Sequence, residues 1–125
     1  MNSQRKLFTK TAIGNWGEDV ACKYLLEAGY EVIERNFRTP YGEIDIIATL
    51  NGQLTFIEVK TRTNNLYGTP ESSITAQKRK HMINAAQSFL QTHMQFDQNW
   101  QIDVISIESN SSQNPIITHF QNAIS

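Results

Sequence analysis

Apolar residues recur at helical spacing in two segments of the chain. Between about Asn15 and Ala28 they repeat every three or four residues, and Gly29 follows where a C-terminal cap is expected. The same period predicts a second helix from about Thr75 to Thr92. The predicted buried stripes are Trp16, Val20, Ala21, Tyr24, Leu25 and Ala28 in the first helix, and Met82, Ile83, Ala86, Phe89 and Leu90 in the second.

Five other segments have the composition and alternation of β-strands. Asn51-Gly52 is a strong signal for a tight hairpin between two of them. The order helix, three strands, helix, two strands predicts one α/β domain, with a five-stranded sheet that opens antiparallel and is flanked by helices. Residues 1–12 are expected to form a flexible basic tail, and residues 13–125 the single domain. The predicted strands are 30–37, 42–49, 53–62, 100–109 and 116–121.

The charge of the chain neither requires nor excludes a nucleic-acid partner. The chain has 125 residues, a net charge of −1 and a pI near 6.3, which argues against a strongly basic nucleic-acid coat. The eleven Lys and Arg residues all lie at or before Lys80. They could form a cationic surface that contacts nucleic acid, or simply a solvated surface. The residues available for such a surface are Arg5, Lys6, Lys10, Lys60, Arg62, Lys78, Arg79 and Lys80.

The sequence predicts a cytoplasmic protein without a membrane partner. No stretch approaches the roughly 20 apolar residues that a membrane span needs, and the N-terminus lacks the apolar run of a signal peptide. The single cysteine, Cys22, allows no internal disulfide and fits a reducing compartment. It has no base adjacent in sequence, and His81, His93 and His119 show no metal-ligand spacing.

Charged residues interrupt the apolar pattern of the predicted hairpin. Counting back from its turn places Glu58 roughly opposite Asp45, and period-two alternation places Lys60 on the same face as Glu58. Strict alternation also groups Ile44 with Ile46 on one face of the second strand, leaving Asp45 on the other. Burying unpaired charge is costly, so these side chains either face water or gather around a ligand.

The grouped carboxylates suggest a divalent-metal site. Asp45, Glu58 and the backbone carbonyl of Val59 offer hard oxygen ligands, which suit Mg²⁺ or Mn²⁺. Lys60 beside such a metal could stabilise an attacking hydroxide, and Glu18 on the first helix could reach the same ion. These are the parts that metal-assisted phosphodiester hydrolysis requires.

Plainer interpretations remain open for the same residues. Asp45 could be an edge charge, and Glu58 with Lys60 a surface pair that contributes well under about 1 kcal/mol. Glu18 near a helix N-terminus is favourable through the helix dipole alone. The run from Lys78 to Lys80 has the pattern of a solvated helix turn, although Lys78 at the helix start could contact phosphate.

Four segments of the chain resemble a known family. These are "GNWGEDVACKYLLEAGYEVIERNFRTPYGEIDIIA", "FIEVKTR", "YGTPESSITAQKRKHMINAAQSFL" and "IDVISI", in that order along nearly the whole chain. They resemble the YraN family of small bacterial proteins, which is similar to archaeal Holliday-junction resolvases and belongs with the PD-(D/E)xK nuclease superfamily. The resemblance implies a restriction-endonuclease-like core. It departs at Gln101, where the family usually has arginine two residues before the aspartate at Asp103.

The resemblance also implies roles for individual residues. Asp45 and Glu58 match the metal-binding acids, Lys60 the catalytic lysine, and Glu18 the helix glutamate used near the metal. Gln77 and Lys78 match helix positions that often approach the substrate. With the charge pattern, this gives an expected nucleic-acid-binding set of Arg62, Gln77, Lys78, Arg79 and Lys80.

Two main hypotheses for the function therefore follow from the sequence. The first is a Mg²⁺- or Mn²⁺-dependent endonuclease that cuts DNA, including branched or structured DNA, with RNA as an open alternative and a homodimer expected by analogy with resolvases. The second is a non-catalytic nucleic-acid-binding or scaffold protein that retains the nuclease fold. A regulatory protein with a structural metal site is a third interpretation.

Overall fold

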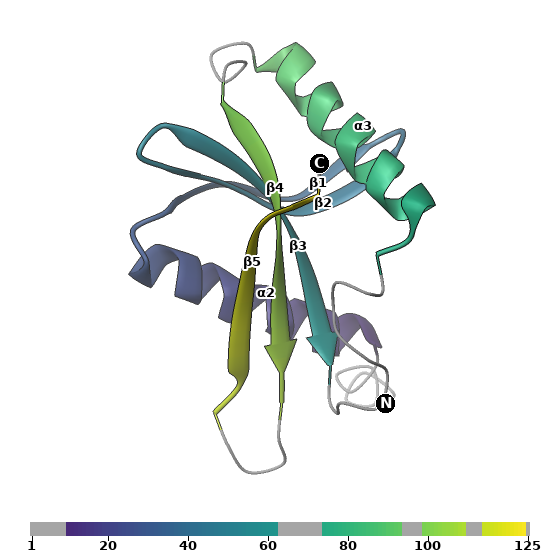
Figure 1. Cartoon of the computed structure of the whole chain (residues 1–125). Helices are drawn as coiled ribbons and strands as arrows, with labels where there is room; N and C mark the ends of the chain where they lie inside the picture. Colours follow the sequence, from purple (N-terminus) through teal and green to yellow (C-terminus); the bar gives the residue numbers. More distant parts are fainter. Residues whose placement is uncertain (1–9, 63–73, 94–98, 110–113, 125) are drawn as a thin grey trace, which may run out of the picture.

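The elements follow the order that the sequence predicts. A computed structural model describes residues 10–62, 74–93, 99–109 and 114–124 (Figure 1). In this part of the chain a helix is followed by three strands, a second helix and two strands. The elements are α2 (Lys10–Glu27), β1 (Glu31–Thr39), β2 (Gly42–Leu50), β3 (Gln53–Arg62), α3 (Ala76–Thr92), β4 (Trp100–Glu108) and β5 (Ile116–Ile124).

The first helix begins earlier than its apolar pattern predicts. α2 starts at Lys10 instead of about Asn15. No proline separates these positions, and the isolated Gly14 costs only about 1 kcal/mol in a helix, so the helix extends beyond its periodic segment. Residues 10–12 of the predicted tail are therefore helical, and residues 1–9 lie outside the described residues.

The five strands form one mixed sheet in the order β1-β2-β3-β4-β5. Pairing is antiparallel between β1 and β2, β2 and β3, and β4 and β5, whereas β3 and β4 are parallel and connected through α3. The predicted turn is confirmed, because Asn51 and Gly52 have φ angles of 51° and 80°. Positive φ at both central residues is the geometry of the tightest hairpins.

Each face of the sheet is covered by one helix, so the domain has two apolar cores (Figure 1). On the α3 face, Phe56 packs against Phe89 with the rings 5.6 Å apart and nearly perpendicular. On the α2 face, Ala21 and Leu25 are fully buried against the sheet. The predicted burial of Trp16 is wrong: its side chain is 39% exposed.

Strand β2 breaks its own alternation at Asp45. Ile44 joins Ile47 in the α3 core, whereas Ile46 packs in the α2 core, so the prediction that Ile44 and Ile46 share a face is wrong. The reason is that β2 parts from β3 here. The paired register ends at Ile46 opposite Ile57, and beyond it a side chain replaces the backbone pairing.

Helix α2 approaches β3 closely at Gly17. Gly17 is buried, and a Cβ at this position would overlap the side-chain Oγ1 of Thr61 near the end of β3. A glycine is therefore required for this approach. The approach sets Glu18, the next residue, beside the end of the sheet where β2 and β3 part.

No helix in the described part of the chain is both long and apolar enough to cross a membrane.

Candidate metal and nucleic-acid site

Glu58 is the centre of a small ionic cluster. It continues the α3 face of β3 after Leu54 and Phe56, and only 6% of its surface is exposed. Its Oε2 lies 3.4 Å from Nζ of Lys60 and 3.6 Å from Nζ of Lys78. The sheet and the helix thus each direct one ammonium group at the same buried carboxylate oxygen.

The first turn of α3 is fixed by its N-cap. The Oγ1 of Thr75 accepts a hydrogen bond from the backbone N–H of Lys78 at 3.0 Å. Such a cap typically stabilises a helix by about 1 kcal/mol. It also defines where α3 begins and therefore where the Lys78 side chain leaves the helix toward Glu58.

Asp45 occupies the gap where β2 parts from β3. Its Oδ2 accepts a hydrogen bond of 2.8 Å from the backbone N–H of Val59. Burial, together with the negative charges of Glu58 and Glu18, raises the pKa of Asp45 to about 7, although the Val59 hydrogen bond and Lys78 act in the opposite direction. Asp45 is thus a half-buried carboxyl group whose neighbours include two other carboxylates and the ammonium group of Lys78.

The predicted backbone ligand points into the same gap. In a β-strand the N–H and C=O of one residue are directed to the same neighbouring strand. Because the N–H of Val59 reaches Asp45, its carbonyl oxygen is also directed toward β2. Two side chains and one backbone carbonyl therefore converge where the β2–β3 ladder ends.

Glu18 lies near Asp45, but its carboxylate contacts Arg35. Burial raises the pKa of Glu18, and this effect exceeds the opposing attraction of Arg35, whose Nη2 lies 3.5 Å from Oε1. The same guanidinium contacts Asp19 at 2.9 Å. Oε1 of Glu18 is buried and accepts no hydrogen bond from the described residues.

The donor set fits a hard divalent cation with several bound waters. In the described part of the chain, no three or more His, Cys, Asp and Glu side chains are arranged to hold a metal ion. The chain therefore offers Asp45, Glu58 and the Val59 carbonyl, with Glu18 in electrostatic range of Asp45. Mg²⁺ commonly binds through one or two carboxylates and retains water, so these oxygen donors fit it.

The other predicted nucleic-acid contacts are more dispersed. Gln77, Arg79 and Lys80 are exposed on the first turns of α3, and Lys78 is the one that reaches the ionic cluster. Arg62 ends β3, half-buried, and its backbone carbonyl accepts a hydrogen bond from Ser109. The structure thus places four of the five residues at the start of α3 and Arg62 at the end of the strand that carries Glu58.

A second buried carboxylate was not singled out as a site by the sequence. Asp103 is fully buried on β4 and accepts hydrogen bonds from three groups. These are Nε2 of Gln101 at 2.9 Å, the backbone N–H of Asn122 at 2.7 Å and Nε2 of His119 at 2.7 Å. On its other side, Nδ1 of His119 lies 2.9 Å from the hydroxyl of Tyr24 on α2.

Gln101, where the sequence departs from the expected pattern, belongs to this network. Its neutral amide donates a hydrogen bond to Asp103. The available signal was a polar residue within the apolar run of β4. His119 could not be found from ligand spacing, because its partners Asp103 and Tyr24 come from distant segments.

Ser106 is a further buried polar group. Its hydroxyl accepts or donates no hydrogen bond within the described residues, and the residue is 1% exposed. It pairs with Lys60 in the parallel β3–β4 register, so it lies beside the ionic cluster. Period-two alternation could have placed it there once the strand pairing was known.

The fold and its charged strand ends define a small α/β protein with a candidate metal site, and sequence comparison identifies its family. Residues 17–107 match the group described as Uncharacterised protein family UPF0102. UPF0102 proteins of Desulforamulus reducens (39% identity, 99% of this chain, 100% of the relative) and Geobacter metallireducens (42% identity, 90% and 91%) are similar to it. So is that of Syntrophomonas wolfei (38% identity, 86% and 96%). The chain belongs to the UPF0102 family.

Proposed function

We propose that this protein is a divalent-metal-dependent endonuclease that hydrolyses phosphodiester bonds in DNA and belongs with the PD-(D/E)xK nucleases. The observation that carries the proposal is the group formed where β2 and β3 part. There Asp45, with a pKa of about 7, lies near Glu58, and two lysines lie within 3.6 Å of the Glu58 carboxylate. Carboxylates, cations and an open strand end together match the needs of phosphodiester hydrolysis.

Each residue has a distinct role in this proposal. Asp45, Glu58 and the carbonyl of Val59 would hold Mg²⁺ or Mn²⁺, with Glu18 assisting directly or through water. When bound, the cation supplies positive charge that stabilises the transition state and makes water easier to deprotonate. Lys60 orients and stabilises the attacking hydroxide, and Lys78 stabilises charge on a phosphate oxygen.

The electrostatics of the site support cation binding. Burial and neighbouring carboxylates disfavour the charged form of Asp45, and a cation between the acids would reverse that effect. The exposed side chains of Gln77, Arg79 and Lys80 continue from the site along α3, where a polyanion would meet them. By analogy with resolvases, we expect a cytoplasmic homodimer acting on branched or structured DNA.

One observation favours the non-catalytic alternative. Glu58 already has two ammonium groups near the same oxygen, so its charge is balanced without a metal ion. A binding protein that retains the nuclease fold would need no more than this cluster and the cationic start of α3. The two functions differ in whether the carboxylates are needed for cleavage.

Cleavage of a nucleic-acid panel separates them. Wild type, Asp45→Asn and Glu58→Gln would be tested on labelled single strands, duplexes, flaps and four-way junctions in Mg²⁺, in Mn²⁺ and in EDTA. Glu34→Gln is a matched control, since Glu34 is an exposed carboxylate on β1. We expect metal-dependent cutting that falls at least about a hundredfold in both site variants and is unchanged in the control.

A second readout does not depend on turnover. Mg²⁺ should raise the melting temperature of the wild type, because a ligand that binds the folded state stabilises it. The rise should be smaller in Asp45→Asn and Glu58→Gln. Absence of cutting in every protein, together with salt-sensitive DNA binding that survives in both variants, would replace the nuclease with the binding protein.

A further inference from the structure

A cavity of about 360 Å³ adjoins the candidate metal site on the α3 face of the sheet. The described residues that line it include Ile74 and Arg79 from the start of α3, Val104 from β4, and Phe120 and Gln121 from β5. Its size falls within the range of roughly 300–1,000 Å³ typical of small-ligand sites. It is therefore large enough to accept part of a substrate.

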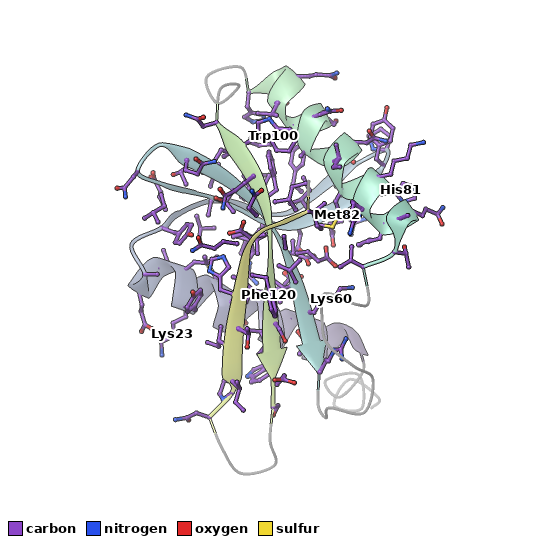
Figure 2. The ribbon with its side chains drawn as sticks, in the orientation of Figure 1. Lys23, Lys60, His81, Met82, Trp100 and Phe120 are labelled. Atoms are coloured by element: carbon purple, nitrogen blue, oxygen red, sulfur yellow. The ribbon has the colours of Figure 1, made fainter. Side chains whose placement is uncertain are left out.

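The strand register places this cavity next to Glu58. Glu58 on β3 pairs with Val104 on β4, and Val104 pairs with Phe120 on β5. The three residues form one row across the sheet, so the row begins in the ionic cluster and ends in the cavity. Figure 2 labels Lys60 on β3 and Phe120 on β5, the two strands on either side of β4, which carries Val104.

Two consecutive residues of α3 contact the ionic cluster and the cavity. Lys78 reaches Glu58, with Nζ 3.6 Å from Oε2, and Arg79 lines the cavity. Because successive side chains on a helix diverge by about 100°, one helical turn can direct a cation to each side. A phosphate at Lys78 and a neighbouring group in the cavity could thus be bound together.

The lining matches the chemistry of a nucleotide. A guanidinium such as that of Arg79 forms paired hydrogen bonds with phosphate oxygens. An aromatic ring such as that of Phe120 stacks on any nucleobase. The amide of Gln121 can donate to and accept from a base edge. All three line one cavity, and Arg79 is exposed there.

We propose that this cavity binds an unpaired nucleotide adjacent to the bond that the site cleaves. The inference rests on the proposed nuclease function and names its substrate class: strands with at least one unstacked base, such as single strands, flaps and branch points. A base within an intact duplex would first have to leave its stack, which costs a few kcal/mol. Fully paired DNA would therefore be a poorer substrate.

The test begins with binding in the absence of metal. A short oligothymidylate and its abasic analogue would be titrated into the full chain in EDTA, with backbone amide shifts as the readout. We expect Arg79→Gln and Phe120→Leu each to weaken oligothymidylate binding about tenfold, and Phe120→Leu to leave binding of the abasic analogue unchanged. Arg38→Gln is the matched control, because Arg38 on β1 is 88% exposed and lies outside the cavity.

Four results decide the matter. Tenfold weakening with shifts centred on residues 120–124 supports the subsite. Absence of saturable binding by wild type, or binding that neither variant weakens, overturns the subsite while leaving the cleavage panel to judge the nuclease. Base-dependent binding lost in the variants, with no cleavage under any metal, keeps the subsite and overturns the nuclease. Phe120→Leu touches the core, so Arg79→Gln on the helix surface decides if the former fails to fold.

Discussion

Two aspartates of one sheet, Asp103 fully buried and Asp45 half-buried, are held in opposite ways. Asp103 accepts three hydrogen bonds, from a side-chain amide, a backbone N–H and a histidine ring. Asp45 accepts a backbone hydrogen bond from Val59 and is surrounded by the charges of Glu58 and Glu18. The first carboxylate has three hydrogen-bond donors from the fold, whereas burial and two neighbouring carboxylates disfavour the charged form of the second.

The difference separates a structural polar group from a candidate functional one. Buried carboxylates are expected to have partners that balance their desolvation. Asp103 meets this expectation with donors from β4 and β5, so it holds those strands together. Asp45 has a backbone N–H as a donor but lies beside Glu58 and Glu18, and its pKa is raised to about 7. Such a shifted carboxyl group is a candidate for a functional role.

The largest expected effect is a loss of stability when the Asp103 carboxylate is removed. Asp103→Ala should lower the free energy of unfolding by about 3–5 kcal/mol, because it leaves buried donors without an acceptor. Chemical denaturation followed by circular dichroism measures the change. Asp19→Ala is the control, with an expected loss under about 1 kcal/mol since Asp19 is exposed. Equal losses in the two variants would contradict the structural role of Asp103.

Asp45 should behave in the opposite way. Its pKa rises from 3.8 to about 7 on folding, so its contribution to stability is present below about pH 4 and is lost as the pH rises through about 7. Asp45→Asn removes that loss and can still accept from Val59. At about pH 8 without metal, the variant should be roughly 2–4 kcal/mol more stable than wild type.

The difference in the free energy of unfolding between Asp45→Asn and wild type should depend on pH, which is the sharper measurement. Denaturation of both proteins between about pH 4 and pH 8 should show this difference becoming smaller as the pH falls and disappearing near about pH 4. Glu34→Gln should show no such change. A stability difference that is constant with pH, or a less stable Asp45→Asn at about pH 8, would contradict the raised pKa of Asp45 in the folded protein.

The smallest effect is expected at the far end of the Asp103 network. Tyr24→Phe removes the hydroxyl that lies 2.9 Å from His119 and should cost about 1 kcal/mol of stability. Thermal unfolding would detect the loss, and the cleavage panel should show unchanged rates per folded molecule. A selective loss of cleavage would instead connect the network to the metal site.

Local patterns predicted the elements and the main charged group. Period-two and helical spacing located all five strands and both helices, and the Asn51-Gly52 turn placed Asp45 near Glu58. The observed pairing ends one residue before Asp45, at Ile46 opposite Ile57, so the turn predicted the proximity of Asp45 and Glu58 but not the end of the ladder. Hairpins are predictable in this way because turn length fixes which residues face each other.

Contacts between distant segments could not be predicted from local sequence patterns. Tyr24 and His119 are 95 residues apart, and no local pattern relates them. The position of Ile44 depends on where β2 leaves β3, which alternation cannot show. Trp16 fits the helical stripe by spacing, yet it is 39% exposed in the structure. These features depend on the final packing of helices on the sheet.

The contact between Gly17 and Thr61 has a consequence for how α2 tolerates substitution. A side chain at position 17 would overlap Oγ1 of Thr61, so even alanine would require the helix or the threonine to move. Glu18 follows directly in the helix, and its charge acts on Asp45. A shift of α2 would therefore change the distance between these two carboxyl groups, so the absence of a side chain at one residue determines the electrostatic environment of another.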